Sequence, residues 1–174
     1  MKPEIDYISD DDVDDALDRE LRDLLMTCFT KPVDVAVFRQ RRYCQEPVPH
    51  RWFISDEHGS IVAHIGVHEK TVEAGGQIYR IGGIAEVCVH PDYRRRGYVR
   101  MMLVRIHEWL GQGEFTFSVL FGRPEVYGSS GYVQVGNLIH GGAKEGWKQA
   151  TAMVKEISAT PWPPGKVYLP GPMF

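Results

Sequence analysis

The chain has 174 residues, of which 43% are hydrophobic and 25% charged, and its net charge is −3. This size and composition are those of one soluble globular domain. No apolar run approaches the roughly 20 residues that cross a bilayer, and the acidic start at Glu4 does not resemble a signal peptide. We therefore expect a single domain over residues 1–174, a cytoplasmic location and no membrane association. The negative charge also argues against general binding of nucleic acid.

The three cysteines, Cys28, Cys44 and Cys88, form no CxxC pair and are too few for a disulfide framework. A reducing compartment fits them, and we interpret them as small buried hydrophobic residues. The seven histidines show no HxxxH or HxH arrangement, so we predict no metal site.

The N-terminal part predicts a short strand over Glu4–Ile8, followed by a helix that starts within Ser9–Asp12. Apolar residues then recur at helical spacing from Val13 to Cys28. We interpret the acidic residues Asp10–Asp15 as the solvated first turn of that helix, with attraction of a cationic substrate as the alternative. A second, shorter helix is expected over Val35–Tyr43.

The middle of the chain is typical of an antiparallel sheet. Glycine-containing turns separate three expected strands, at Trp52–Ser55, Ile61–Glu69 and Ile78–Val89. Gly82 and Gly83 interrupt the third strand, which indicates a bulge or the close approach of another backbone.

The clearest helix has a single apolar stripe from Val99 to Leu110 and ends at Gly111 and Gly113. The remaining expected elements are a strand at Phe115–Leu120, a short helix from Pro124 to Ser130 stopped by Gly131, three short strands at Val133–Val135, Thr151–Ile157 and Val167–Leu169, and a proline-rich loop at Pro161–Gly165. This order predicts a mixed α/β or α+β fold in which helices flank one sheet.

A basic turn follows the strand that ends at Val89. Four arginines, Arg94, Arg95, Arg96 and Arg100, surround Gly97 where the long helix begins. The first turn of a helix has unpaired N–H groups and the positive end of the helix dipole, and guanidinium groups suit phosphate. The sequence therefore predicts a phosphate-binding turn, although a run of arginines alone is also typical of solvated surface.

The pattern Arg94-x-x-Gly97 after Val-x-Val-x-Pro resembles the coenzyme A signature of the GNAT superfamily of N-acetyltransferases. The resemblance implies a GNAT-like fold with a central, mostly antiparallel twisted sheet, and acetyl-coenzyme A as co-substrate. It also implies that the main chain of Val87, Cys88 and Val89 holds the pantetheine arm. The pyrophosphate would be held by Arg94, Arg95, Arg96, Gly97, Tyr98, Val99 and Arg100.

One position departs from the signature, because its usual last small residue is Val99 here. The variant Arg-Arg-Arg-Gly-x-x-Arg is similar to the enhanced intracellular survival group of GNAT enzymes. Only the backbone N–H of Val99 is required for binding, so we expect the larger side chain to be tolerated.

A second segment, Glu125–Tyr132, resembles the GNAT signature that follows the fifth strand. The resemblance implies that Tyr127 lies near the sulfur of coenzyme A and protonates the departing thiolate, since a phenol with a pKa of about 10 carries a proton at neutral pH. The alternative is that Tyr127 is a packing aromatic residue.

The residue that accepts the proton of the amine has two candidates. Glu86 lies on the strand that would hold the pantetheine arm, and a glutamate on this strand is the base in part of the superfamily; the alternative is a glutamate that faces a solvated cleft. In the enhanced intracellular survival group and in aminoglycoside 2′-N-acetyltransferases the C-terminal carboxylate points into the active site, which implies the same for Phe174. The alternative for Phe174 is that the apolar terminus closes the sheet. An acetylated Cys88 is a competing mechanism that we do not favour.

The resemblance implies transfer of an acetyl group from acetyl-coenzyme A to the primary amine of a small molecule by direct attack. Three alternatives stay open: acetylation of a protein lysine or N-terminus, a non-catalytic domain that binds acyl-coenzyme A, and an acyl donor longer than acetyl. A homodimer is a family-level expectation. Contacts with the acceptor are expected from Phe38, Tyr43, Glu46 and Trp52, each of which also suits packing.

Overall fold

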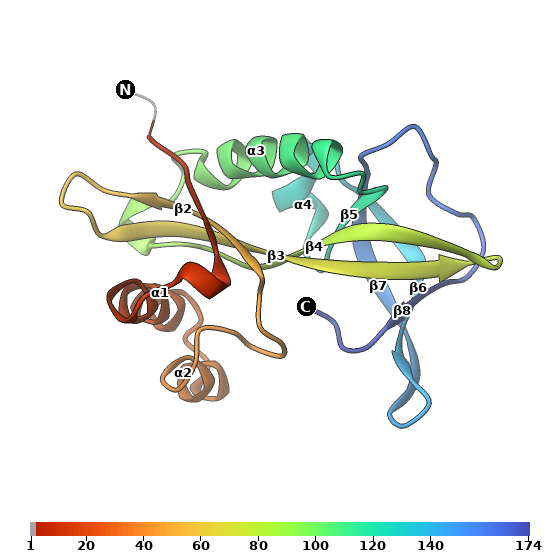
Figure 1. Cartoon of the computed structure of the whole chain (residues 1–174), viewed down its shortest axis with the longest axis horizontal. Helices are drawn as coiled ribbons and strands as arrows, with labels where there is room; N and C mark the ends of the chain where they lie inside the picture. Colours follow the sequence, from red (N-terminus) through yellow and green to blue (C-terminus); the bar gives the residue numbers. More distant parts are fainter. Residues whose placement is uncertain (1–2) are drawn as a thin grey trace. The chain divides into compact units, whose positions relative to one another are not determined.

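The computed structural model describes residues 3–174, which divide into two compact units. The first unit holds the residues up to His68 together with Ala85–Val104. The second unit holds Glu69–Ile84 and Arg105–Phe174. Two strands and one helix, β3, β4 and α3, pass from one unit into the other (Figure 1).

The described residues form eight strands and four α-helices. The strands are β1 (Asp6–Ser9), β2 (His50–Ser55), β3 (Ile61–Ala74), β4 (Gln77–Val89), β5 (Phe117–Leu120), β6 (Val133–Gly142), β7 (Gly146–Glu156) and β8 (Val167–Pro170). The helices are α1 (Asp15–Cys28), α2 (Pro32–Phe38), α3 (Tyr98–Gln112) and α4 (Pro124–Tyr127), with 3₁₀ turns at Asp10–Asp12, Pro91–Tyr93 and Gly128–Ser130.

In the first unit the strands lie in the order β1-β2-β3-β4, and β2 pairs antiparallel with both β1 and β3. The helices α1 and α2 lie on one side of these strands and the first half of α3 on the other (Figure 1). The core between the strands and α1 and α2 is built from Leu21, Leu24, Leu25, Phe38, Ile61 and Cys88.

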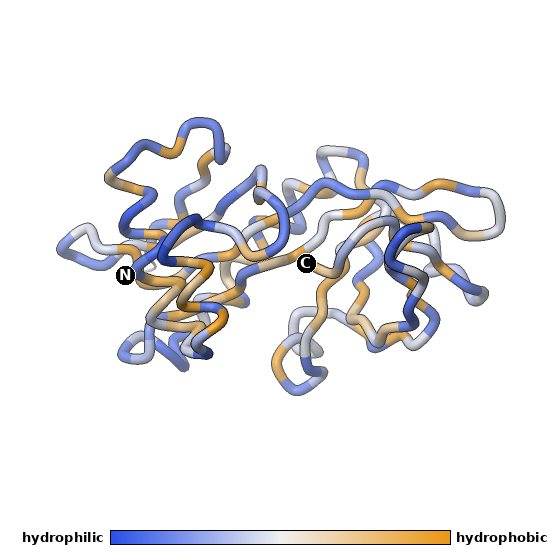
Figure 2. Tube along the Cα trace, turned by 90° about the horizontal axis from the view of Figure 1, so that it is seen from below, coloured by the Kyte–Doolittle hydropathy of each residue, from blue (hydrophilic) through white to orange (hydrophobic). Residues whose placement is uncertain are grey.

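Helix α1 begins where Asp14 caps it, because the carboxylate of Asp14 accepts a hydrogen bond from the N–H of Leu17 at 2.8 Å. Its apolar residues recur every three or four positions, so that one face is buried and the other is solvated. Figure 2 shows the resulting mixture of hydrophobic and hydrophilic positions along the coiled N-terminal part of the chain.

The second unit is a sheet that closes on itself. Its strands lie in the order β3-β4-β5-β7-β6-β8, and β8 also pairs with β3 through Tyr168 and Glu73. The pairs β4–β5 and β6–β8 are parallel, whereas β5–β7 and β6–β7 are antiparallel. Side chains of these strands fill the core of the unit: Val72, Ala74, Ile81, Phe117, Val119, Leu138, Ala152, Val154, Val167 and Leu169.

The predicted mixed α/β class, with helices that flank a mostly antiparallel sheet, is confirmed. Three details were wrong. Asp10–Asp12 do not begin α1 but form a separate 3₁₀ turn, whereas Asp14 caps α1 and Asp15 lies in its first turn. The second helix lies earlier, at Pro32–Phe38, because Pro32 suits the first turn of a helix. The last strands are much longer than expected, since β6 and β7 form an extended hairpin from Val133 to Glu156.

Candidate functional site

The basic turn between β4 and α3 is exposed. Gly97 has φ +76° and Arg95 has φ +62°, so two residues in the left-handed region turn the chain into the helix. The four arginines of this turn, Arg94, Arg95, Arg96 and Arg100, are exposed, and none forms an ion pair with a carboxylate within residues 3–174. The turn therefore combines uncompensated positive charge with the free N–H groups of a helix N-terminus.

Tyr93 anchors the basic turn through its hydroxyl and its ring. Its hydroxyl donates a hydrogen bond to the carboxylate of Asp56 at 2.9 Å, and the guanidinium of Arg96 lies 4.6 Å from the centre of its ring. The backbone N–H of Ser60 and the Tyr93 hydroxyl hold the pKa of the Asp56 carboxyl below its ordinary value, so it accepts at neutral pH. These contacts anchor the turn to the loop between β2 and β3.

The end of β4 supplies Val87, Cys88 and Val89. Cys88 is buried in the core of the first unit, against α1. The neighbouring Cys28 thiol and burial raise the pKa of the Cys88 thiol well above its ordinary value, so it is protonated at neutral pH. A protonated buried thiol is a poor nucleophile, which favours a role for the backbone of this segment.

Glu86 bends β4 just before these residues. Its φ of +51° lies in the left-handed region, which is costly for a residue with a side chain. The carboxylate accepts hydrogen bonds from the N–H of Cys44 at 2.8 Å and from Nη1 of Arg51 at 3.4 Å. The side chain is only 7% exposed, and burial raises the pKa of its carboxyl to about 7.

A buried polar cluster surrounds Glu86, and its centre is Arg51, whose side chain is fully buried. Arg51 donates from Nε to Asp10 at 2.6 Å and from Nη2 to the carbonyl of Arg42 at 2.9 Å. Arg42 in turn binds Asp10 at 2.8 Å and Asp18 at 3.0 Å. The cluster thus balances two buried or half-buried arginines with three carboxylates.

His64 completes the cluster and is also fully buried. Burial and the charge of Arg51 lower the pKa of His64 to about 3, so the ring is neutral at physiological pH. Nδ1 lies 3.0 Å from the carbonyl oxygen of Glu86, and Nε2 lies 3.2 Å from Nη1 of Arg51. Since a carbonyl only accepts and a guanidinium only donates, the proton of the ring is on Nδ1.

Tyr127 lies in the second unit, at the end of α4. Its ring packs on Gly122, where a Cβ atom would lie 2.8 Å from Cδ2 of the ring. Burial raises the pKa of its phenol, so the hydroxyl is protonated at neutral pH. Within the described part of the chain no group forms a hydrogen bond with this hydroxyl.

Tyr132 holds the segment that carries Tyr127. Its buried hydroxyl lies 2.7 Å from Oγ of Ser118 on β5 and 2.9 Å from Nε2 of His107 on α3. The rings of Tyr127 and Tyr132 meet edge to face, with their centres 6.2 Å apart. The two tyrosines of the sequence motif therefore differ, because one is tied to the fold through its hydroxyl and the other is not.

Phe174 also lies in the second unit. Its ring packs against Gly83 of β4, where a Cβ atom would lie 2.8 Å from Cζ, and against the ring of Phe121 at 5.1 Å. Gly82 is equally crowded, by the side chain of Leu110. The expected bulge or backbone approach at Gly82-Gly83 was therefore wrong. The side chains of Leu110 and Phe174 approach the strand there, and the left-handed bend of β4 is at Glu86.

The structure brings Glu86, Val87–Val89 and the basic turn together in the first unit. Of the acidic residues expected to be solvated, Asp11, Asp12, Asp14 and Asp15 are exposed, whereas Asp10 is ion-paired with Arg42 and Arg51. Sequence reasoning missed this polar cluster, since no local pattern connects its members. Phe38 and Trp52, two expected acceptor contacts, are buried packing residues.

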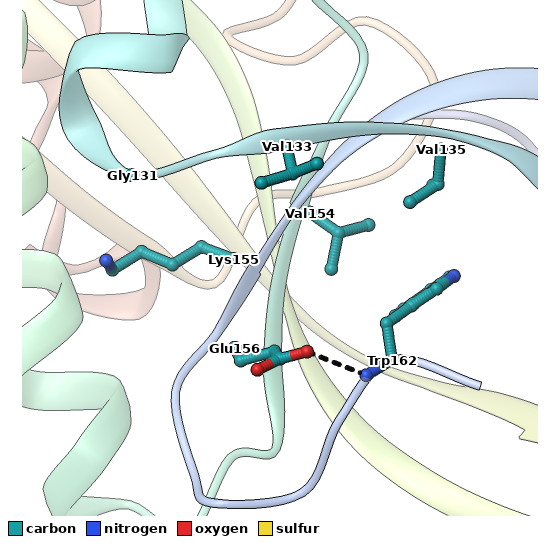
Figure 3. Close-up of a pocket in the computed structure, with 7 residues that line it drawn as sticks. All are labelled: Gly131, Val133, Val135, Val154, Lys155, Glu156 and Trp162. Atoms are coloured by element: carbon teal, nitrogen blue, oxygen red, sulfur yellow. Dashed lines mark hydrogen bonds between the residues drawn. The ribbon is translucent and has the colours of Figure 1, made fainter. Parts of the chain in front are cut away.

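A surface hollow of about 370 Å³ lies in the second unit, beside β6 and β7. Figure 3 shows Val154 and Trp162 on one side and Lys155 extending away from them, while Glu156 accepts a hydrogen bond from the N–H of Trp162 at 2.9 Å. None of the expected site residues lines this hollow. The charged groups of Lys155 and Glu156 do not converge in it, so the hollow is not a candidate catalytic site.

Within residues 3–174, no three or more histidine, cysteine, aspartate or glutamate side chains are grouped so that they could hold a metal ion. In the same part of the chain, no helix is long and apolar enough to span a membrane.

Solved structures share this fold at low sequence identity. The GNAT N-acetyltransferase YhbS from Escherichia coli, in complex with coenzyme A, is 16% identical with a TM-score of 0.67, and the match covers 97% of this chain and 91% of that one. A probable N-acyltransferase from Enterococcus faecalis V583 is 16% identical with a TM-score of 0.62, over 78% of this chain and 33% of that one. Eis1 from Mycobacterium abscessus is 12% identical with a TM-score of 0.57, over 78% and 32%.

The chain thus spans about a third of the length of the last two proteins. No curated protein sequence matches it. A family model described as an acetyltransferase (GNAT) domain matches residues 4–135. Since that match covers more than half of the 174 residues and contains both the basic turn and Tyr127, the chain belongs to the GNAT acetyltransferase family.

Proposed function

We propose that this N-acetyltransferase transfers an acetyl group from acetyl-coenzyme A to the primary amine of a small molecule by direct attack. The observation that carries the proposal is the basic turn. Four arginines without carboxylate partners in the described residues surround the N-terminus of the 15-residue helix α3, directly after the bent end of β4. Such a turn suits the pyrophosphate of coenzyme A.

The binding roles follow the order of the chain. Backbone groups of Val87, Cys88 and Val89 bind the pantetheine arm, and the segment Arg94–Arg100 binds the pyrophosphate. Gly97 supports this role because it has a positive φ at the turn into the helix, and because no atom lies within 4 Å of a Cβ built there, so the space beside it is open. Tyr98 and Val99 contribute through their backbone N–H groups, so the valine side chain does not obstruct binding.

The proposed reaction has one chemical step. The nitrogen of the neutral amine attacks the thioester carbonyl carbon, the C–S bond breaks, and the sulfur takes a proton from the hydroxyl of Tyr127. The excess proton on the nitrogen passes to a base or to water, and the Tyr127 phenolate regains a proton from water, which returns the enzyme to its starting state. A phenol with a raised pKa and no hydrogen-bond partner within residues 3–174 is available to donate its proton to the thiolate.

Glu86 is the proposed base, because a carboxyl with a pKa of about 7 is half ionised at neutral pH. Its carboxylate is, however, engaged by the N–H of Cys44 and by Arg51, so it would act through water. The carboxylate of Phe174, as base or substrate anchor, is the second proposal. Appending residues after Phe174 tests it, since turnover should fall while acetyl-coenzyme A affinity is kept.

Three other functions use the same binding turn: acetylation of a protein lysine or N-terminus, non-catalytic binding of acyl-coenzyme A, and transfer of a longer acyl group. The test is release of the free coenzyme A thiol from acetyl-coenzyme A with a panel of aminoglycosides, polyamines, amino acids and basic peptides. Turnover with a small amine supports the proposal. Turnover only with peptides supports protein acetylation, and tight binding without turnover supports a binding domain.

A matched pair of variants tests the turn itself. The double substitution Arg95→Ala and Arg96→Ala should weaken acetyl-coenzyme A binding by about 100-fold or more, since each of the two charged hydrogen bonds contributes about 1.5–3 kcal/mol. Arg105→Ala on the same helix removes a charge outside the turn and should leave the affinity unchanged. Equal affinities of both variants, measured by calorimetry, would contradict the assignment.

A further inference from the structure

The bend at Glu86 requires a cause beyond its own sequence. Glu86 is not a glycine, yet it has φ +51° in the interior of β4. A left-handed residue within a strand acts as a bulge, which interrupts the alternation of the strand and re-aims the residues that follow. Such a conformation persists only where surrounding contacts hold it.

His64 supplies the contact to the bent backbone itself. Its Nδ1–H donates to the carbonyl oxygen of Glu86 at 3.0 Å, from the neighbouring strand β3. His64 is fully buried, so water cannot replace this bond. The neutral ring has one proton, and the proton is needed on Nδ1.

Arg51 fixes the orientation of His64. Its Nη1 donates to Nε2 of the ring at 3.2 Å and to the Glu86 carboxylate at 3.4 Å, so one guanidinium edge holds both the histidine and the side chain of the bent residue. The other edge is anchored to Asp10 and to the carbonyl of Arg42. Arg51 therefore has no freedom to rotate away.

We infer that His64 and Arg51 are positioning residues for the pantetheine-binding strand: through the Glu86 carbonyl they hold the bend that directs the backbone groups of Val87–Val89 at the arm of coenzyme A. The inference rests on the proposed function. The bent segment is bounded, because the N–H of His90 is hydrogen-bonded to the carbonyl of Val62 on β3 at 2.8 Å. Relaxation of the bend would thus alter the three residues between these two fixed points.

Two substitutions of His64 separate the two bonds of the ring. His64→Asn places an amide N–H near the position of Nδ1 and retains the donor to the Glu86 carbonyl. His64→Gln places its amide near the position of Nε2, so it can face Arg51 but loses that donor. Both are buried neutral side chains, which makes them matched controls. Arg51→Lys is a further variant that retains the positive charge and loses the bond to the ring.

The measurement is calorimetric affinity for two ligands: coenzyme A, and its nucleotide half, 3′-phosphoadenosine 5′-diphosphate, which lacks the arm. Thermal melting establishes that each variant is folded. We expect His64→Gln and Arg51→Lys to bind coenzyme A about tenfold more weakly, the effect of one lost buried hydrogen bond, and to bind the nucleotide half like the wild type. His64→Asn should bind coenzyme A more tightly than His64→Gln, because it retains the donor to the Glu86 carbonyl, and should bind the nucleotide half like the wild type.

Unchanged affinity of His64→Gln and Arg51→Lys for coenzyme A would overturn the inference. An equal loss for both ligands would also overturn it, because it would indicate a general structural role. If His64→Gln does not fold, Arg51→Lys and His64→Asn decide by the same criteria. Failure of the wild type to bind either ligand is a different result, since it would remove the proposed function and the inference with it.

Discussion

Glu86 and Tyr127 are held in opposite ways. Glu86 is fixed by polar contacts to Cys44, Arg51 and His64, and all of these contacts are at least partly buried. Tyr127 is fixed by packing on Gly122 and Tyr132, and its hydroxyl has no partner within residues 3–174. A buried polar cluster depends on each of its members, whereas a packed ring leaves its polar atom available for chemistry.

The largest effect on the free energy of unfolding is expected when the polar cluster around Glu86 loses its central charge, Arg51. Arg51→Met leaves Glu86 without its ion-pair partner and Asp10 with Arg42 alone, and we expect the free energy of unfolding to fall by about 3–5 kcal/mol. The matched control is Arg105→Met, because the pair Arg105–Glu108 is exposed and should contribute less than about 0.5 kcal/mol. Urea titration measures both, and similar effects would refute the contrast.

Tyr127 should show the reverse behaviour. Tyr127→Phe removes a hydroxyl without a described partner, so we expect little change in stability and in acetyl-coenzyme A affinity, but a loss of turnover of about 100-fold or more. Tyr132→Phe is the control: it leaves the hydroxyl of Ser118 and the ring of His107 without this partner and should cost about 1–2 kcal/mol of stability. Turnover and melting are measured for both variants. A Tyr127→Phe variant with wild-type turnover would exclude the acid role.

The pH dependence of stability tests the protonation states of His64 and Glu86 in the polar cluster. The pKa of His64 is lowered from 6.5 to about 3, so between these values the unfolded state binds the extra proton and stability rises with pH. The pKa of Glu86 is raised from 4.5 to about 7, so between these values the folded state binds the extra proton and stability falls with pH.

The two effects oppose each other between about pH 4.5 and 6.5. We therefore expect stability to rise steeply only below about pH 4.5, by up to ~1.4 kcal/mol per pH unit for one proton, and to decline slightly toward pH 7. Asp10 also makes stability rise with pH in the acid range, because Arg42 and Arg51 lower the pKa of its carboxyl despite burial. In His64→Asn the slope of the free energy of unfolding against pH should decrease in the acid range, by the amount that corresponds to about one proton. Urea titrations from pH 3 to 8 test this, and an unchanged slope would contradict the buried neutral histidine.

The smallest effect on stability is expected where the ring of Phe174 packs on Gly83 of β4. Gly83→Ala places a Cβ atom 2.8–3.0 Å from the ring of Phe174, which must shift, at a cost of about 1 kcal/mol. Gly136→Ala on β6 is the control, since no atom lies within 4 Å of the added Cβ. Thermal melting of both variants decides, and equal melting temperatures would show that the terminal ring does not pack firmly on β4.

Sequence reasoning succeeded where the signal is local. The basic turn at Arg94–Arg100, the helix after it and the short helix before Gly131 are each specified by neighbouring residues, and the structure has all three. The bend of β4 was not predictable, because glycine is the usual sign of an irregular strand and pointed to Gly82-Gly83. Glu86 is held in the left-handed region by His64 and Arg51, which lie 22 and 35 residues away in the sequence.

The length of the β6–β7 hairpin was underestimated for a related reason. Its outer half, around Trp147, contains glycines and charged residues that are typical of a loop when taken alone. Pairing between the strands, from Leu138 with Ala150 to Gly142 with Gly146, overrides that local preference.

The closure of the second unit through Glu73 and Tyr168 has a consequence for how the chain folds. These partners are separated by more than half of the sequence, so the closing contact has a high entropic cost and forms late. During synthesis, every residue of the first unit has been added to the chain once Val104 is made, whereas the sheet of the second unit cannot close until β8 has been made. The order of translation thus favours the unit with the basic turn as the first to acquire structure.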